Sequence, residues 1–403
     1  MTSNTAAWSS TQLCTKCCTQ EATLDQRSHA VCVGCFTKFI NTKSVKQLGI
    51  LGKETKPPII PNPSGSGPPT IGIRRYLLGL SLGVSSTCLL QLLHENCRFQ
   101  LSKGRSAPFE LTVVHIYNDT FTTPSTAESF LTPYKARYPA FTFLSNPLSQ
   151  SLILPSINWP SLSASLSLPS SHPTSLREFL TSLPPSQASQ SDIVNLLVRH
   201  LLLSLTISTS SQALLLGHST TAIAELTLSQ TAKGRGFSLP WTINDGLFTF
   251  SNQKVLVSHP LRDILRKELI EFTKLTYPPL EGLIPDLGQE KQEGQVLNYK
   301  DLSIEEVMTR YFADVEKNYP SVVANVARTS AKLVRIFEIA EGQKGCGLCG
   351  MPMDGEGDER WRGELGERDL GTKEEGKIET EEEKKRREGR RGLCYGCQRS
   401  TLG

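Results

Sequence analysis

Cysteine is absent from the long middle of this 403-residue chain, although the sequence contains 11 cysteines. None lies between Cys97 and Cys346, which excludes a cysteine nucleophile from that stretch. A long apolar run is also absent. The longest candidate, residues 193–207, is interrupted by polar and basic side chains and is shorter than the roughly 20 residues of a membrane helix. The first residues lack the basic start and apolar core of a signal peptide. We therefore expect a cytoplasmic protein without a membrane segment.

A chain of this length can bury a sizeable core and hold more than one folded unit. Its net charge of +4 favours no class of partner. Changes in composition predict an N-terminal cysteine module at 1–56, a Pro/Gly/Ser linker at 57–70, an α/β domain at 71–340 and a C-terminal cysteine module at 341–403. The last module contains a charged insertion, 354–391, in which 25 of 38 residues are Lys, Arg, Asp or Glu. Because this insertion has almost no apolar residues, it cannot contribute to a core.

Eight of the cysteines form four C-x-x-C pairs, and two such pairs can hold a soft divalent ion in a tetrahedral site. The pairs are Cys14/Cys17, Cys32/Cys35, Cys346/Cys349 and Cys394/Cys397. The spacing of the first two pairs suits a zinc ribbon, although a redox role for one pair is an alternative. The last two pairs are separated by the charged insertion and either share one zinc ion or act independently. We expect structural zinc at both ends, because four thiolates leave no open position for a substrate.

Apolar stretches of strand length alternate with helical patterns in the middle of the chain, which predicts a parallel sheet covered by helices. Strands are expected at 76–80, 111–117, 212–216 and 255–258. Helices are expected at 86–97, 175–182, 192–203, 220–232, 260–272, 303–317 and 320–338. We expect the first of these helices to begin at a serine cap. The Ser- and Pro-rich stretch 145–190 predicts long loops with short helical pieces.

A short loop, S-L-G-V-S-S, joins the first expected strand to the first expected helix. A turn of this kind presents backbone N–H groups to a phosphate in α/β proteins, although a purely structural turn is an alternative. The loop resembles the S-G-G-x-D-S motif of PP-loop ATPases, which adenylate their substrates, and Ser81, Gly83 and Ser86 match it. Leu82 stands where the motif has glycine and restricts the backbone. Ser85 stands where the motif has Asp, so a metal or nucleotide contact is lost.

Later segments extend this resemblance to the tRNA-thiolating branch of the PP-loop family. Gly217 and His218 match the start of a G-H-x-x-x-D-x-x-E-T segment, whose Asp is missing here. The segments K-G-R-G-F-S-L-P-W at 233–241 and H-P-L-R-D at 259–263 are also similar, as is the N-terminal order of cysteine pairs. Together the motifs cover nearly the whole chain. It is identified as a degenerate, non-catalytic member of the PP-loop tRNA-thiolation family.

The resemblance implies a PP-loop-type sheet between two zinc modules and a role in 2-thiolation of wobble uridine (mcm5s2U) in cytoplasmic tRNAs for Lys, Glu and Gln. It implies a heterodimer with a catalytic PP-loop thiolation subunit, bound tRNA, and sulfur from a thiocarboxylated ubiquitin-related modifier, with protein urmylation as a further activity of that pathway. The degenerate loop implies that ATP is not bound or is bound unproductively. Thiol-based sulfur delivery requires an accessible low-pKa cysteine. Cys88 and Cys97 are instead expected to be buried packing thiols.

The candidate contact residues fall into two groups, and no catalytic residue is assigned. The degenerate nucleotide site comprises Ser81, Gly83, Ser85, Ser86, Gly217 and His218. The candidate RNA contacts are cations able to bind a phosphate backbone, namely Lys38, Lys43, Lys46, Lys233 and Arg235. Solvated surface cations and a structural histidine are the alternatives for these residues. For the whole chain, the alternatives are an active ATP-dependent tRNA-modifying enzyme and a zinc-ribbon adaptor for protein partners.

Overall fold

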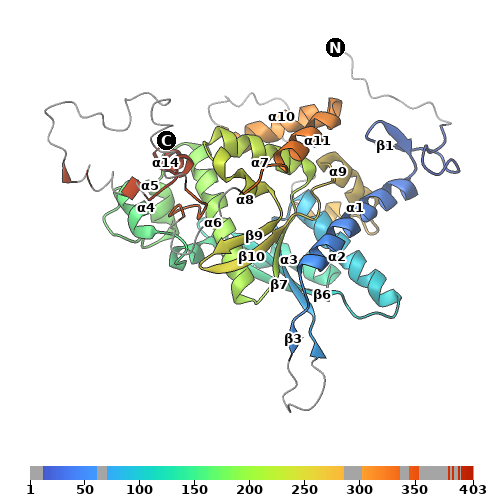
Figure 1. Ribbon diagram of the computed structural model, residues 1–403, viewed down its shortest axis with the longest axis horizontal. Coiled ribbons are helices and arrows are strands. Elements are labelled where there is room, and N and C mark those ends of the chain that lie inside the picture. The colour runs from blue at the N-terminus through green and yellow to red at the C-terminus, as the bar shows by residue number, and fades with distance from the viewer. Residues whose placement is uncertain are drawn as a thin grey trace.

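A computed structural model describes residues 12–60, 70–285, 302–335, 345–353, 380, 381, 384, 389–390 and 392–402. Most of the charged insertion and the middle of the expected linker lie outside these residues. The described chain forms a six-stranded sheet with helices on both faces and a cysteine module at each end of the molecule (Figure 1). The α/β fold class expected from the sequence is therefore confirmed.

The sheet has the strand order β7-β6-β5-β8-β10-β9. The strands span, in this order, Thr142–Pro147, Phe109–Tyr117, Arg74–Gly79, Ala213–Leu216, Gln253–Ser258 and Gly246–Phe250. All neighbours are parallel except the edge strand β9, which pairs antiparallel with β10. The chain runs from β5 outward through β6 and β7, and then returns to the other side of β5 as β8. This reversal leaves a crevice beyond the carboxyl ends of β5 and β8, where open α/β sheets bind ligands.

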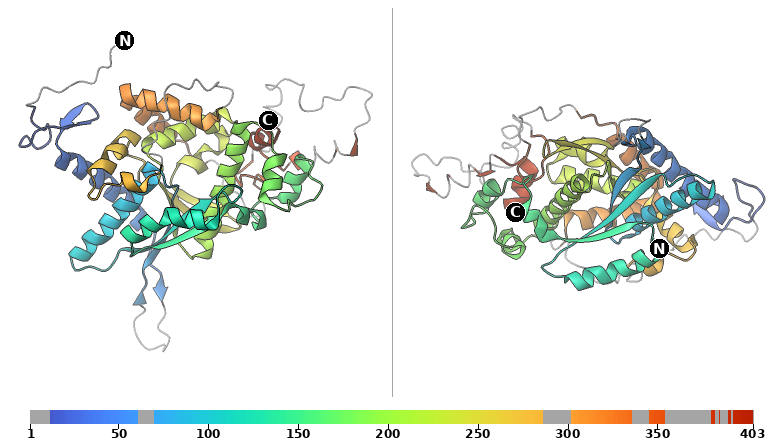
Figure 2. Two further views of the ribbon diagram at one scale, coloured as in Figure 1. Left: turned by 180° about the vertical axis from the view of Figure 1, so that it is seen from behind. Right: turned by 90° about the horizontal axis from the view of Figure 1, so that it is seen from below.

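Alternating side chains of the strands enter two separate cores. Leu78 of β5 enters one core and Leu77 enters the other, and both are fully buried. Burial on both faces explains why these parallel strands are almost continuously apolar. The first core is covered by α1 (Val33–Glu54), α2 (Val84–Ser102), α3 (Pro124–Arg137) and α9 (Arg266–Leu275). The second is covered by η1 (Leu148–Ile153), α4 (Trp159–Ser165), α5 (Leu176–Ser182) and α6 (Gln187–Ser208) (Figure 2).

A further helical layer packs beside the carboxyl end of β8. It consists of α7 (Thr220–Ala232), α8 (Leu239–Ile243), α10 (Ile304–Asn318) and α11 (Pro320–Ser330). The Ser219 hydroxyl caps α7 by accepting a hydrogen bond from the backbone N–H of Ala222 at 3.2 Å, and Ser303 caps α10 with a reciprocal bond from Glu306. These caps explain why both helices begin where the sequence predicts. The short η2 (Gly236–Ser238) and η3 (Glu281–Leu283) complete this part of the chain.

Several helix boundaries differ from the sequence expectations, and α6 extends beyond the expected 192–203 at both ends. Helix α2 begins at Val84, and its N-cap is Gly83, which provides no side-chain cap. Helix α9 begins at Arg266 instead of residue 260. Asp245 accepts hydrogen bonds from the backbone and ring nitrogens of His259, and the residues between His259 and the helix form a turn. Helix α11 ends at Ser330, short of residue 338, because Arg335 donates to the carbonyl of Asn244 and draws the following chain toward β9. The sequence did not predict β7, β9 or α3.

Helix α6 contains the apolar stretch noted in the sequence. Among the described residues it is the one helix with the length and composition of a membrane span, and half of that stretch is buried. It packs against β5, β8 and β10, so it is a core helix of this fold.

The two ends of the chain dock on opposite sides of the molecule. The N-terminal module contains β1 (Leu24–Gln26), β2 (His29–Val31) and α1, and it is joined to α9 by an ion pair between Arg27 and Glu268 at 2.7 Å. The C-terminal module ends in α14 (Tyr395–Leu402), which packs on α6. At the two ends of the expected linker 57–70, β3 (Ile59–Ile60) pairs antiparallel with β4 (Thr70–Ile71).

Candidate functional site

The four N-terminal cysteines of the C-x-x-C pairs form one cluster. The Sγ atoms of Cys14, Cys17, Cys32 and Cys35 lie within 4.8 Å of one another, and the Cys17 and Cys32 sulfurs are 3.7 Å apart. The backbone N–H of Cys35 points at the Cys32 sulfur at 3.4 Å, an arrangement that stabilises a thiolate. The neighbouring Cys18 is exposed and outside the cluster.

The C-terminal cysteines form a second cluster of the same kind, although the charged insertion separates its two pairs. The Sγ atoms of Cys346, Cys349, Cys394 and Cys397 lie within 4.8 Å of one another, and those of Cys349 and Cys394 are 3.7 Å apart. The backbone N–H of Cys394 points at the Cys346 sulfur at 3.2 Å. The two pairs therefore meet at one site, in agreement with the sequence alternative in which they share one metal ion.

The geometry of each cluster fits one metal ion of its own. A tetrahedral zinc ion with Zn–S bonds of about 2.3 Å places its sulfur ligands roughly 3.8 Å apart, close to the 3.7 Å found in each cluster. The donor set among the described residues is four thiols, which suits a closed structural site. Each cluster can hold one metal ion and has no open coordination position for a substrate.

The segment that resembles the PP-loop motif forms the turn between β5 and α2. Leu82 has a φ of 62°, in the left-handed region that favours glycine, and its side chain is largely buried in the first core. The hydroxyls of Ser81 and Ser86 bond to each other at 3.0 Å, and Ser86 also donates to the carbonyl of Gly83. The serine expected as a helix cap thus stabilises the loop instead.

Gly217 lets the end of β8 approach this loop closely. A Cβ at position 217 would lie 2.7 Å from the Cα of Ser86 and 2.8 Å from its nitrogen. A larger residue would therefore push the loop away from β8. The structure brings together all six residues of the predicted degenerate nucleotide site, because β5, its loop and β8 are adjacent.

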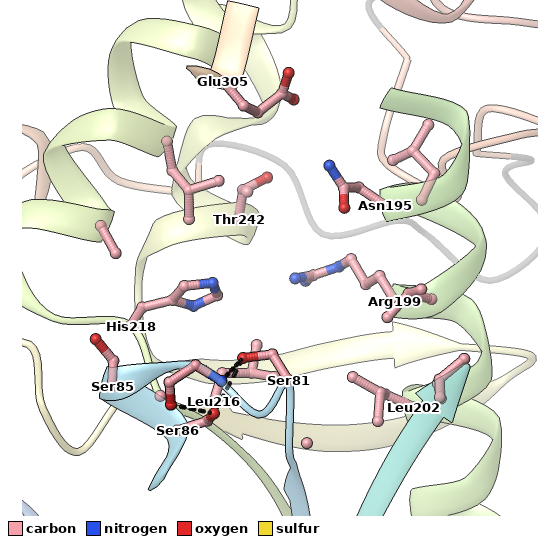
Figure 3. A pocket seen from close by; sticks show the side chains of 18 of the residues that line it. Ser81, Ser85, Ser86, Asn195, Arg199, Leu202, Leu216, His218, Thr242 and Glu305 are labelled. Carbon is pink, nitrogen blue, oxygen red and sulfur yellow. Dashed lines mark hydrogen bonds between the residues drawn. The ribbon is translucent and has the colours of Figure 1, made fainter. Parts of the chain in front are cut away.

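A cavity of about 720 Å³ opens at this point, beyond the carboxyl ends of β5, β6 and β8. Figure 3 shows Ser81, Ser85 and Ser86 on one side, and His218 and Arg199 projecting toward each other above them. Asn195, Thr242 and Glu305 lie farther up. The apolar walls include Leu196, Leu202, Leu216 and Leu226. The volume and the mixed lining are those of a small-ligand pocket.

The basic and imidazole groups of the pocket differ in protonation. Burial lowers the pKa of His218 to about 3, with the neighbouring His259 contributing, so its ring is neutral at physiological pH. Burial lowers the pKa of Arg199 to about 10, so its guanidinium remains charged. Arg199 was not among the sequence candidates. The sequence feature that could have identified it is its charge, because charged residues are rare in an apolar, buried stretch such as that of α6.

Lys233 and Arg235 do not lie on an RNA-accessible surface, which corrects the sequence expectation. Only 6% and 3% of their surfaces are exposed. The Asp192 carboxylate accepts from the Lys233 ammonium at 2.8 Å and from Arg235 at 2.6 and 2.8 Å, and Lys233 also pairs with Glu305. The Ser400 hydroxyl of α14 donates to Asp192 at 2.6 Å. We call Asp192, Lys233, Arg235 and Ser400 the buried ion cluster; it attaches the C-terminal module to α6.

Three of the predicted RNA contacts remain at the surface of α1. Lys38 and Lys46 are exposed, and the Lys43 ammonium lies 5.8 Å from the centre of the Phe39 ring. Their spacing along one helix gives the N-terminal module a basic side.

The thiols outside the clusters offer no nucleophile to the pocket. Cys88 is fully buried and Cys97 largely so, and burial raises the pKa of both, to about 11 for Cys97. They are packing thiols, as expected. The C-terminal cluster itself reaches the pocket, because Cys349 and Met351 form part of its wall. The sequence did not predict this proximity.

Comparison with known proteins gives a consistent match. The family model described as cytoplasmic tRNA 2-thiolation protein 2 matches residues 303–399. Proteins of that name from Sclerotinia sclerotiorum and Phaeosphaeria nodorum are 37% and 34% identical to this chain. The first alignment covers 79% of this chain and 81% of the relative, and the second covers 96% and 94%.

Among solved structures, the fold is similar to that of the U34-tRNA thiolase NcsA from Methanococcus maripaludis, solved with its 4Fe-4S cluster. The TM-score is 0.53 at 14% sequence identity, over 85% of this chain and 97% of the thiolase. This likeness identifies the sheet as a PP-loop-type sheet.

Removing the central carboxylate of the buried ion cluster is expected to destabilise the protein strongly. Asp192→Ala leaves the buried Arg235 guanidinium without its carboxylate and leaves Lys233 with Glu305 alone, so we expect a loss of about 3–5 kcal/mol, measured as a lower urea midpoint. The matched control is Glu110→Ala, which breaks the exposed pair with Arg75 and is expected to lose at most about 1 kcal/mol. Equal losses in the two variants would contradict this role.

The same cluster predicts a pH dependence. Burial alone would raise the pKa of Asp192, but Arg235 and Lys233 outweigh it and hold that pKa below its usual value. The stabilisation is therefore fully present above the unfolded-state pKa and is lost as the pH falls through the folded-state pKa. Asp192→Ala should flatten this acid-side decline in the midpoint.

Proposed function

This chain belongs to the cytoplasmic tRNA 2-thiolation protein 2 family, and on this premise we propose that it is a non-catalytic subunit in the 2-thiolation of wobble uridine. It acts in the cytoplasm on tRNAs for Lys, Glu and Gln, and it supports a catalytic PP-loop subunit. The altered phosphate loop is the observation that carries the proposal. Leu82 occupies a glycine-like backbone position, and Ser85 stands where PP-loop ATPases have Asp.

The chemistry of the pocket supports a role without catalysis. Apart from Cys349, which belongs to the metal-type cluster, no cysteine lines the described pocket. A persulfide or thiolate for sulfur transfer therefore has no evident position in the described lining of this pocket. The sulfur would be delivered in the partner subunit, and the donor would be a thiocarboxylated ubiquitin-related modifier.

The basic side of α1 is proposed as a tRNA contact. Lys38, Lys43 and Lys46 lie on the module that docks against α9, away from the C-terminal cluster. Cations of this kind bind the RNA backbone without reading its sequence. The partner would then provide the uridine-specific contacts.

The two cysteine clusters are proposed to hold structural zinc. Each zinc ion would stabilise the fold of one cysteine module. The modules are 1–56 and 341–403, and the PP-loop-type domain at 71–340 lies between them in the sequence. The N-terminal ion would support the base of α1, because Cys32 is the N-cap of that helix. The C-terminal ion would support α14 and the pocket wall.

Loop and cysteine variants are expected to behave differently in cells that lack the natural protein. Ser81→Ala with Ser86→Ala removes both hydroxyls of a mutual hydrogen bond, so neither is left unpaired, and tRNA thiolation should remain largely intact. Cys14→Ser with Cys17→Ser removes two metal ligands and should abolish it. The measurement is mercury-gel retardation of tRNAs for Lys, Glu and Gln. A lost retarded band with the loop variant, at normal protein level, would overturn the non-catalytic role.

Metal content tests the cofactor proposal. Because two clusters are present, elemental analysis of the purified protein should find about two zinc ions per chain. Cys346→Ser should reduce this to about one. Cys18→Ser is the matched control and should change nothing, since Cys18 lies outside the cluster. Iron in place of zinc, or a loss of zinc with Cys18→Ser, would contradict the assignment.

A further inference from the structure

The basic, glycine-rich segment after α7 is the surface on which the last C-x-x-C pair docks. A Cβ on Gly234 would lie 2.3 Å from the ring of Tyr395. A Cβ on Gly396 would lie 2.4 Å from the Cγ atom of Arg235 and 2.6 Å from the carbonyl oxygen of Lys233. Both separations are shorter than a van der Waals contact, so neither position has room for a side chain. One glycine on each segment therefore lets the start of α14 pack directly against the chain that follows α7.

This close docking places a guanidinium against a sulfur of the C-terminal cluster. The Nη2 atom of Arg235 donates to the Cys397 Sγ at 3.5 Å. Asp192 fixes the orientation of the guanidinium, because its carboxylate accepts from both Nη atoms at 2.6 and 2.8 Å. Arg235, Asp192 and Cys397 are all buried, so water competes little for these bonds. A carboxylate, an arginine and a thiol of the cluster thus form one series of contacts.

A metal ion in this cluster would require positive charge around it. Four thiolates outweigh the charge of one divalent ion, so the occupied site has an excess of negative charge. Cys346, Cys349 and Cys397 are buried, where an uncompensated charge is costly. Arg235 provides a fixed positive charge and a charge-assisted hydrogen bond to one sulfur. Groups in this position orient the ligands of a metal and tune its binding.

The N-terminal cluster lacks a contact of this kind among the described residues. Its sulfurs accept from backbone N–H groups, from Lys16 to Cys14 and from Cys35 to Cys32, each at 3.4 Å. No Lys or Arg side chain in the part of the chain that the structure describes bonds to these sulfurs. Cys17 and Cys35 are also only partly buried. The two clusters therefore have the same donor set but differ in the charge beside it.

We propose that Arg235, oriented by Asp192, is a positioning residue of the C-terminal metal site and makes it the tighter of the two sites. Metal binding at this site and docking of α14 then occur together, because the same guanidinium takes part in both. The N-terminal site lacks this support and releases its metal ion first. The inference rests on the proposal that each cluster holds zinc, and not on the proposed role in thiolation.

The test is a chelator titration of the purified, zinc-loaded full chain, followed by thiol alkylation and peptide mass spectrometry, which reports on each cysteine separately. In the wild-type chain, the N-terminal cluster should become alkylated at a lower chelator concentration than the C-terminal cluster. Arg235→Lys keeps a positive charge beside Asp192 but loses the planar fork. Its C-terminal cluster should therefore release zinc at an about tenfold lower chelator concentration, while the N-terminal cluster is unchanged.

Two glycines at the same position of their C-x-G-C sequences provide a matched pair of variants. Gly396→Ala changes no ligand and no charge, but its Cβ would push Arg235 and the Lys233 carbonyl away. Zinc retention by the C-terminal cluster should fall by about tenfold. Gly34→Ala is the control, because its Cβ would meet nothing closer than 3.8 Å, and both clusters should keep their wild-type retention.

A spectroscopic measurement separates positioning from support of the fold. Cobalt(II) can replace zinc in a tetrahedral thiolate site, and a hydrogen bond to sulfur raises the energy of sulfur-to-cobalt charge transfer because it stabilises the sulfur electrons. In the cobalt-loaded chain, Arg235→Lys should shift part of this absorption to longer wavelength. Gly34→Ala should leave the absorption where it is.

Each contrary outcome is distinct. Zinc release from the C-terminal cluster before the N-terminal one, or unchanged retention in Arg235→Lys and Gly396→Ala, would overturn the proposal and leave the zinc assignment intact. An Arg235→Lys chain that loses zinc more readily with no shift in cobalt absorption would reduce Arg235 to a structural contact and also contradict it. A wild-type chain without metal in the C-terminal cluster would refute both this inference and the cofactor proposal. If Arg235→Lys fails to fold, the order of release in the wild-type chain and the Gly396→Ala variant still decide.

Discussion

The reversal of strand order at β5 is the constraint on which the other features depend. Because β6 and β8 lie on opposite sides of β5, the connections that follow β5 and β8 diverge, and a pocket forms beyond the carboxyl ends of these strands. Gly217 lets β8 come close enough to fix the loop, since its absent Cβ leaves room for Ser86. In this loop Leu82 occupies a backbone position that favours glycine. The loop thus lies at the point of the fold that the resemblance implies, while Leu82 and Ser85 replace two residues of the PP-loop motif.

The C-terminal module is part of this pocket and not an appendage. The buried ion cluster joins α6, the segment after α7, and α14 through one carboxylate, that of Asp192. Cys349 and Met351 then contribute directly to the pocket wall. A metal ion bound by the C-terminal cluster would therefore be coupled to the shape of the pocket through packing. The N-terminal module, in contrast, docks on α9 at the opposite end of the molecule (Figure 1) and leaves its basic side available to a large ligand.

The sequence predicted the features that depend on local pattern or on ligand spacing. The helix at 220–232 was predicted to the residue, and the cysteine pairs meet as their spacing indicates. It failed where distant residues decide the outcome. Lys233 and Arg235 have the pattern of a basic glycine-rich loop, yet Asp192 and Ser400, about 40 and 165 residues away, bury them. Arg199 could be noticed as an exception in an apolar helix, but its contacts with Trp241 and Phe248 depend on how the distant elements pack. The start of α9 was predicted wrongly for a similar reason, since the turn before the helix depends on hydrogen bonds between His259 and the more distant Asp245.

The most direct test of a PP-loop fold without PP-loop catalysis is the release of pyrophosphate from ATP, with transfer of AMP to tRNA, by the purified chain in the presence of its tRNA. With Leu82 and Ser85 in the loop, we expect no tRNA-dependent pyrophosphate release, while the catalytic partner assayed alongside should produce it. Pyrophosphate release by this chain alone, dependent on tRNA and abolished by Ser81→Ala with Ser86→Ala, would contradict a non-catalytic role.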